Sequence, residues 1–147
     1  MDFNLSWRGR RILGDHKTMR GLVSGIITGI ITVWIQKKLI INSDYLSNLI
    51  NIDYLKVNWL LLGMLLGGGA IIGDAAKSFF KRQTDIPSGQ SWFVFDQIDY
   101  ILGGIIFSIF YWPLTLLQYL SIVIIFFLLH IIVTNIGFVL GLKEKPI

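Results

Sequence analysis

Four long apolar runs limit the folds that this chain can adopt. They span residues 21–41, 59–80, 98–112 and 114–142, with few charged side chains in each. A transmembrane helix needs about 20 mostly apolar residues, and in lipid only helices or closed barrels satisfy the backbone. None of the runs shows the period-2 alternation of a barrel strand. We therefore predict an all-α integral membrane protein, a bundle of four transmembrane helices in which residues 1–147 form a single domain.

The composition supports a membrane protein. Of the 147 residues, 54% are hydrophobic and only 15% are charged, and the mean hydropathy is +0.66. A soluble domain carries about 25% charged residues, so no separate soluble domain is expected. The absence of cysteine excludes disulfides, thiolate metal sites and cysteine nucleophiles. The N-terminal 20 residues have no apolar segment, so a signal peptide is not expected.

The positions of lysine and arginine predict how the helices are oriented, because basic residues favour the cytoplasmic side. They gather before the first run, after the second and in the C-terminal tail: Arg8, Arg10, Arg11, Lys17, Arg20, Lys81, Arg82, Lys143 and Lys145. The loop at 42–58 lies on the other side, together with Lys37, Lys38 and Lys56. We therefore predict a multi-pass cell-membrane protein whose termini and 73–99 segment face the cytoplasm.

A polar stripe at the end of the second run is the strongest functional signal. Ionisable groups at a membrane boundary are costly and are usually there for function. Asp74, Lys77, Ser78 and Lys81 follow the i, i+3, i+4, i+7 spacing of one helix face. Arg82 follows them directly. Lysine and arginine at these positions would neutralise phosphate charge, and the arginine could bind phosphate bidentately.

Two further carboxylates, Asp96 and Asp99, share a face at the start of the third run. Carboxylates from two helices can converge on a hard cation such as Mg²⁺, and Asp74 would complete the set. Phosphoryl-group transfer asks a protein mainly for positioning and electrostatics. We therefore predict a cytosol-facing site for a metal and nucleotide phosphates. The alternative is a belt of paired charges that only anchors the helix ends.

A second basic block precedes the first run and includes Arg11, Lys17, Thr18 and Arg20. The amides and dipole at a helix N-terminus favour anions, so a triphosphate could be held between this block and the carboxylates. Alternatively, the block is a positive-inside anchor that binds anionic lipid.

In the fourth run, His130, Thr134 and Asn135 stand in an otherwise apolar stretch. They could form hydrogen bonds between helices or line a site for a lipid head group. Glycines at a spacing of four in the first and second runs predict close helix packing without a chemical role. Gly73 is the exception, because it directly precedes the first carboxylate.

These motifs resemble those of a known family. The pattern Gly73-Asp74, Lys77-Ser78, Lys81-Arg82 and then Asp96-Gln97-Ile98-Asp99 is similar to the signature of CDP-archaeol synthases. These archaeal-type membrane cytidylyltransferases resemble phosphatidate cytidylyltransferases in their site. Residues 10–21 resemble the second block of the family, and His130, Asn135, residues 140–143 and Pro146 resemble its C-terminal helix. The resemblance covers essentially the whole chain.

The resemblance implies a nucleotidyltransferase of membrane phospholipid biosynthesis. It would join the cytidylyl group of CTP to a lipid monophosphate, 2,3-bis-O-(geranylgeranyl)-sn-glycerol 1-phosphate, and release pyrophosphate. The matched positions imply that Asp74, Asp96 and Asp99 bind Mg²⁺ and act in catalysis together with Lys81. They imply phosphate binding by Arg11, Lys17, Thr18, Arg20, Lys77, Ser78 and Arg82. They also imply that a lipid head group lies near His130 and Asn135. The partners expected are CTP, the lipid phosphate, membrane lipids and a second copy in a homodimer, and no nucleic acid.

One departure from the family pattern concerns the N-terminus. Family members usually begin with a further transmembrane helix, whereas only residues 1–7 precede the basic block here, so we expect this chain to lack that helix. Three alternatives stay open: a phosphatidate cytidylyltransferase making CDP-diacylglycerol, a small magnesium transporter, and an inactive lipid-binding protein. The transporter is disfavoured because the carboxylates gather at one membrane face and not along a pore.

Overall fold

The computed structural model describes residues 6–7, 10–11, 13, 17–49, 55–84, 86, 92 and 94–142. In these ranges the chain forms five helices: α1 (Met19–Ile41), α2 (Asp44–Leu49), α3 (Trp59–Gln83), α4 (Phe95–Ser108) and α5 (Leu116–Val139). Two short strands, β1 (Ser6–Trp7) and β2 (Arg10–Arg11), pair antiparallel before α1. The described part is therefore helical apart from this small hairpin.

Three helices, α1, α3 and α5, are long and apolar enough to cross a membrane. This finding indicates an integral membrane protein, as predicted. The run predicted at 98–112 forms α4, which has 14 residues and falls short of the about 20 that a spanning helix needs. The predicted count of four spanning helices is therefore not confirmed. A turn follows α4, and Pro113 prevents the helix from continuing beyond it, because proline disfavours a helical conformation in the preceding residue, Trp112.

The segment 42–58, predicted as a loop, contains a short helix. Part of this segment forms α2, and the hydroxyl oxygen of Ser43 accepts a hydrogen bond from the Leu46 amide at 3.3 Å. Asp44 in the first turn suits the helix dipole. A short polar sequence can therefore form a helix here because its first turn is capped.

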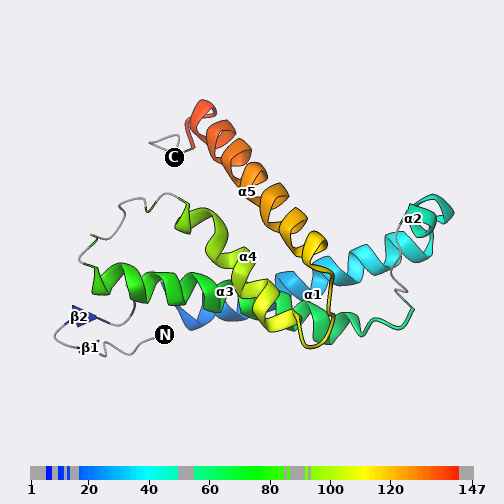
Figure 1. The fold of residues 1–147 in the computed structure, drawn as a ribbon, viewed down its shortest axis with the longest axis horizontal. Helices are drawn as coiled ribbons and strands as arrows, with labels where there is room; N and C mark the ends of the chain where they lie inside the picture. Colours follow the sequence, from blue (N-terminus) through cyan, green and yellow to red (C-terminus); the bar gives the residue numbers. More distant parts are fainter. Residues whose placement is uncertain are drawn as a thin grey trace.

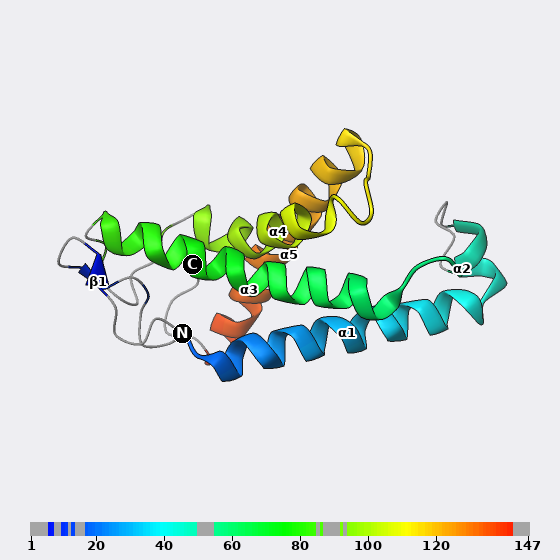
Figure 2. The same ribbon diagram turned by 90° about the horizontal axis from the view of Figure 1, so that it is seen from below.

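The helices are arranged in an open bundle (Figures 1 and 2). α1 and α3 lie side by side, α4 packs on α3, and α5 contacts α4 while pointing away from the other helices. α5 begins with a capping box between Thr115 and Gln118, which starts the helix directly after Pro113. Most of its residues are exposed and most of the exposed ones are apolar, as expected for a helix that faces lipid.

Glycines allow the helices to approach closely, as predicted. A Cβ atom on Gly29 would lie 2.5 Å from the carbonyl oxygen of Gly63, which brings α1 against α3. A Cβ atom on Gly69 would lie 2.5 Å from the carbonyl oxygen of Gly103, which brings α3 against α4. Both separations are too short for a real side chain, so these positions need glycine.

Candidate active site between α3 and α4

The candidate site lies where α4 begins alongside the C-terminal part of α3. Successive turns of α3 carry Asp74, Lys77 and Lys81, and the first turns of α4 carry Asp96 and Asp99. The contact is backbone to backbone, because a Cβ atom on Gly73 would overlap the carbonyl oxygen of Asp99. The residue before Asp74 therefore lets Asp99 approach it from the other helix.

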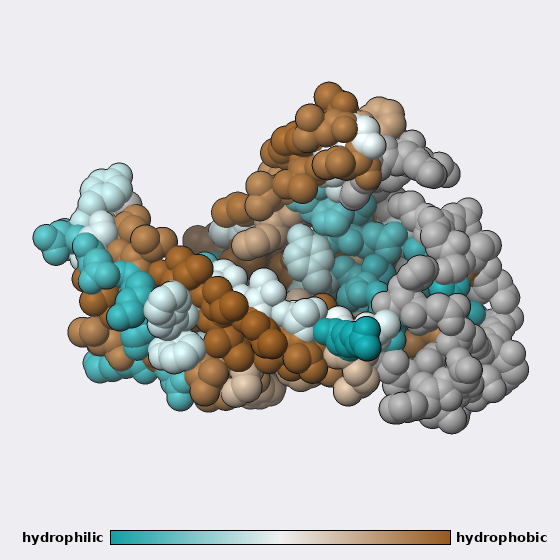
Figure 3. All heavy atoms as spheres, turned by 180° about the vertical axis from the view of Figure 1, so that it is seen from behind, coloured by the Kyte–Doolittle hydropathy of each residue, from teal (hydrophilic) through white to brown (hydrophobic). Residues whose placement is uncertain are grey.

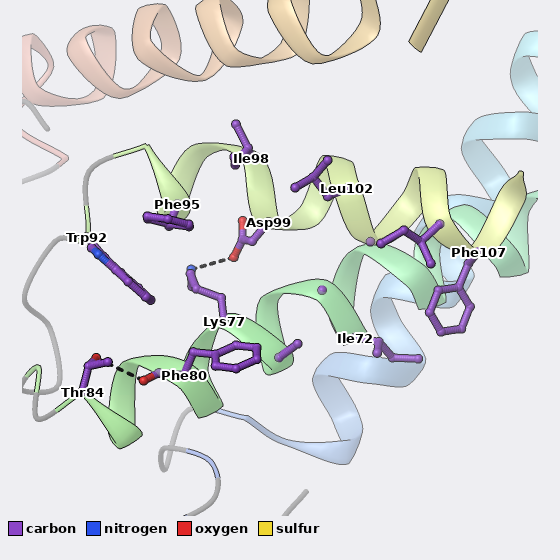
Figure 4. Close-up of a pocket in the computed structure, with 14 residues that line it drawn as sticks. Ile72, Lys77, Phe80, Thr84, Trp92, Phe95, Ile98, Asp99, Leu102 and Phe107 are labelled. Carbon is purple, nitrogen blue, oxygen red and sulfur yellow. Dashed lines mark hydrogen bonds and ion pairs between the residues drawn. The ribbon is translucent and has the colours of Figure 1, made fainter. Parts of the chain in front are cut away.

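Lys77 lies at the centre of three carboxylates. Its Nζ atom is 3.1 Å from Asp74 Oδ1, 2.9 Å from Asp96 Oδ1 and 2.7 Å from Asp99 Oδ2. Figure 4 shows Lys77 and Asp99 pointing toward each other across the gap between the helices. The structure thus brings together the three carboxylates predicted as metal ligands, but an ammonium group lies between them. In the described residues no group of three His, Cys, Asp or Glu side chains is placed to hold a metal as it stands.

Two more lysines complete this cluster, which we call the carboxylate–lysine cluster (Asp74, Asp96, Asp99, Lys17, Lys77 and Lys81). Lys17, just before α1, donates a hydrogen bond to Asp74, and Lys81 Nζ lies 3.4 Å from Asp96 Oδ2. The three positive charges balance the three negative ones. The segment before α1 therefore reaches the carboxylates through Lys17, and its predicted role in phosphate binding stays a prediction.

The two carboxylates of α4 differ in their surroundings. Asp96 Oδ2 accepts a hydrogen bond from the Trp92 amide at 2.7 Å. Burial acts to raise the pKa of Asp96, but this amide and the ammonium of Lys77 outweigh it and hold the pKa below its usual value. The side chain of Asp99 is only 7% exposed. Its Oδ2 atom is buried and makes an ion pair but no well-directed hydrogen bond with the described residues.

The sequence of this chain is similar to those of one known family. The family model described as CarS-like CDP-archaeol synthase matches residues 1–147. The chain belongs to the CDP-archaeol synthase family. A CDP-archaeol synthase of Methanospirillum hungatei is 35% identical over 99% of this chain and 88% of its own length. Those of Methanoculleus marisnigri (37%, 94% and 82%) and Methanosarcina barkeri (35%, 94% and 83%) are similar. No solved structure matches the chain.

Other positions that match the family pattern have structural contacts of their own. Thr18 caps α1, because its Oγ1 atom accepts a hydrogen bond from the Gly21 amide at 3.0 Å. Ser78 donates to the carbonyl oxygen of Asp74 at 2.9 Å, within its own helix. Arg82 donates to the carbonyl oxygen of Ile86 at 3.4 Å, just after α3. These contacts leave their predicted roles in phosphate binding untested.

The remaining predicted residues lie on β2, α1 and α5. Arg20 is exposed in the first turn of α1, and the side chain of Arg11 lies outside the described residues. The His130 ring lies 6.0 Å from the ring of Tyr100, centroid to centroid, so α5 meets α4 beside Asp99. Asn135 donates to the carbonyl oxygen of Ile131 at 2.8 Å, within α5. A lipid head-group role for His130 and Asn135 stays a prediction.

The sequence analysis missed an apolar cavity next to the cluster. The cavity has a volume of about 610 Å³ and lies between α3 and α4, with Lys77 and Asp99 among its walls. Its other walls are almost all apolar, and Phe80, Trp92 and Phe95 line it near Lys77 (Figure 4). Seen from behind, hydrophilic residues gather in the hollow below the hydrophobic surface of α5 (Figure 3). A stripe of aromatic residues around the polar linker was the signal that could have indicated this cavity.

Proposed function

We propose that this protein is a CDP-archaeol synthase. It transfers the cytidylyl group of CTP to 2,3-bis-O-(geranylgeranyl)-sn-glycerol 1-phosphate and forms CDP-archaeol and pyrophosphate. Membership of the family supports the reaction class. The observation that carries the proposal is the meeting of a charged cluster and an apolar cavity at Lys77 and Asp99, because the reaction needs a phosphate site beside a site for a lipid chain.

The chemistry requires little covalent help from the protein. An oxygen of the lipid phosphate attacks the α-phosphorus of CTP, and the bond from that phosphorus to the β-phosphate oxygen breaks, so that pyrophosphate leaves. A phosphate monoester is mostly a dianion at neutral pH, since its second pKa is about 6, and therefore needs no base. The protein has to hold two anions together and neutralise their charge. Lys17, Lys77 and Lys81 are placed to do this, with Arg82 at the end of α3.

The donor atoms of the cluster fit a hard cation. Carboxylate oxygens from two helices are the ligands that Mg²⁺ prefers, and Asp74, Asp96 and Asp99 would hold it. When bound, Mg²⁺ would neutralise charge on the phosphates and orient them. All three carboxylates contact one ammonium, and this contact supports the proposal that they share a single divalent cation.

The cavity fits the lipid acceptor. Its walls on α4 include Ile98, Leu102 and Ile106, successive apolar residues of one helix face. A chain lying along them would place its phosphate at the end where Lys77 and Asp99 stand. The apolar walls set no requirement for an ester or an ether, so the isoprenyl-ether acceptor rests on the family.

We place the site and both termini at the cytoplasmic face, because basic residues concentrate at the ends of α1 and α3 that meet there. For the C-terminus this placement requires that α4 crosses the membrane together with α1, α3 and α5. A homodimer belongs to the proposal, in which part of the exposed apolar surface of α1 and α5 would face a second copy and the rest would face lipid. The mass of the protein in detergent micelles tests it.

The decisive experiment measures pyrophosphate release from CTP by the purified protein with Mg²⁺. Geranylgeranyl-ether phosphate and phosphatidate are compared as acceptors. We expect release with the ether lipid. Release with phosphatidate alone would make the protein a CDP-diacylglycerol synthase, and no release with either acceptor by a folded preparation would overturn the proposal.

A further inference from the structure

The position of Lys77 raises a question that the proposed reaction leaves open. Its ammonium contacts Asp74, Asp96 and Asp99 at 2.7–3.1 Å, and its side chain is only 15% exposed. These are distances of strong charge-assisted contacts. The same residue therefore lies where the three carboxylates would receive a divalent cation. A metal and Lys77 cannot both lie between them.

The buried Oδ2 atom of Asp99 is an oxygen that Lys77 does not fully satisfy. Asp99 Oδ2 has no well-directed hydrogen bond in the described part of the chain, although Lys77 lies 2.7 Å away. Buried polar atoms normally have such a partner. The ammonium of Lys77 carries one charge that three carboxylates share, and a divalent ion in its place would bring twice that charge to this oxygen.

Because the charges of the cluster are paired, binding of the metal or of the triphosphate alone is unfavourable. A metal by itself would displace Lys77 and leave an unpaired ammonium in a partly buried site. A triphosphate by itself would have to draw lysines away from carboxylates and then face those carboxylates. Bound together, the metal takes the carboxylates and the phosphates take the lysines, so every charge keeps a partner.

Lys77 can make this exchange because of where its side chain lies. Its ammonium is carried on a flexible four-carbon stem, and it borders the cavity between α3 and α4 (Figure 4). A small rotation would turn the ammonium from the carboxylates toward a phosphate at the cavity wall. Lys81 is different, because its ammonium pairs with Asp96 alone among the described residues, at the longer distance of 3.4 Å.

We propose that Lys77 is an exchangeable internal cation that occupies the metal position until a divalent ion and a nucleoside triphosphate arrive together. Lys77 then leaves the carboxylates for the phosphates, and the two ligands bind with positive cooperativity. The proposal rests on the proposed function, since it takes the cluster as the metal and nucleotide site.

The test measures Mn²⁺ binding, followed by the signal of free Mn²⁺ in electron paramagnetic resonance. The purified full chain is titrated with and without α,β-methylene-CTP, which cannot be cleaved at the bond that the reaction breaks. We expect the analogue to tighten Mn²⁺ binding about tenfold or more, within the usual range of such couplings, after correction for Mn²⁺ held by free analogue. An unchanged affinity in the wild-type protein would overturn the proposal.

Lys77→Met and Lys81→Met form a matched pair. Lys77→Met should bind Mn²⁺ alone about tenfold tighter than the wild type and lose most of the coupling, because the competing ammonium is gone. Lys81→Met should bind Mn²⁺ alone like the wild type, because the Lys81 ammonium pairs with Asp96 at the longer distance of 3.4 Å, and should bind the analogue more weakly. Without metal, Lys77→Met should also unfold at a lower temperature than the wild type and recover with Mn²⁺. Equal or weaker Mn²⁺ binding by folded Lys77→Met would overturn the proposal.

The outcomes separate this inference from the proposed function. If the wild type binds Mn²⁺ tightly without nucleotide and also releases pyrophosphate, the reaction stands and the exchange by Lys77 is wrong. If it binds neither Mn²⁺ nor the analogue, the site assignment itself fails. Reciprocity provides a check without any variant, because Mn²⁺ must tighten binding of the analogue by the same factor.

Discussion

Two helix contacts in this molecule are packed through glycines in the same way but differ in their role. The contact of α1 with α3 brings Gly29 against Gly63, and the contact of α3 with α4 brings Gly69 against Gly103. No charged residue lies in α1 between Gly21 and Gln36 or in the first half of α3, so the first contact itself carries no charged group. The second continues to Gly73, where the carboxylates begin. Close backbone approach therefore becomes functional where charged residues follow the glycines.

The largest effect should come from Asp99→Asn, which removes the most buried carboxylate of the second contact. Loss of a charged group at a reacting centre costs about 10²–10³ in rate, and we expect pyrophosphate release to fall by that factor. Asp44→Asn, an exposed carboxylate in α2, is the matched control and should keep full activity. Equal activity in the two variants would mean that Asp99 has no role in the reaction.

The next effect should come from Gly73→Ala, which adds one methyl group where the backbone of Asp99 touches α3. The methyl group would overlap the carbonyl oxygen of Asp99, so α4 must move away and carry both of its carboxylates with it. A misplacement of about 1 Å can cost 10²-fold in rate, and we expect a loss approaching this in kcat.

Gly104→Ala is the control for this change. A Cβ atom there would lie 3.7 Å from its nearest neighbours, an ordinary contact, in the same helix pair. If both variants lose the same activity, the effect belongs to α4 as a whole and not to the close approach at Gly73.

The opposite result is expected at the other contact. Gly29→Ala would place a Cβ atom 2.5 Å from the carbonyl oxygen of Gly63, and such overpacking destabilises by about 1–3 kcal/mol. We expect earlier unfolding in detergent and, for the folded fraction, a much smaller fall in kcat than with Gly73→Ala, because only Lys17 among the described residues of the cluster is attached to α1. Gly68→Ala, whose nearest neighbour would be 3.6 Å away, should unfold like the wild type. A large fall in kcat for Gly29→Ala would break the distinction between the two contacts.

Much of this distinction could be predicted from the sequence. Apolar length predicted α1, α3 and α5, and helical spacing placed Asp74, Lys77 and Lys81 on one face. These properties depend on local sequence, which is why they can be recognised without a structure. A threonine directly before an apolar run is also a cap signal, so the contact of Thr18 with the Gly21 amide could have been predicted too.

The features that could not be predicted from the sequence depend mostly on how separate segments pack. Spacing alone does not show which basic residue lies among the carboxylates, because that depends on how α4 sits against α3; only the structure shows that it is Lys77. The cavity beside it is formed by two helices whose sequences are simply apolar. The early end of α4 and the short α2 also went unpredicted, because a turn before a proline and a capped first turn are weak signals in an apolar chain.

The smallest effect is expected at the far end of the first contact, where Lys37 joins α1 to the segment that leads into α3. Its ammonium donates hydrogen bonds to the carbonyl oxygens of Val57 at 2.8 Å and Leu55 at 3.4 Å. Hydrogen bonds to a charged group contribute about 1.5–3 kcal/mol when buried, and partial exposure here should reduce this to about 1 kcal/mol. Lys37→Met should therefore lower the unfolding temperature slightly and leave pyrophosphate release unchanged. Lys38→Met, an exposed neighbour, is the control, and equal stability of the two variants would show that Lys37 does not fasten this end of the contact.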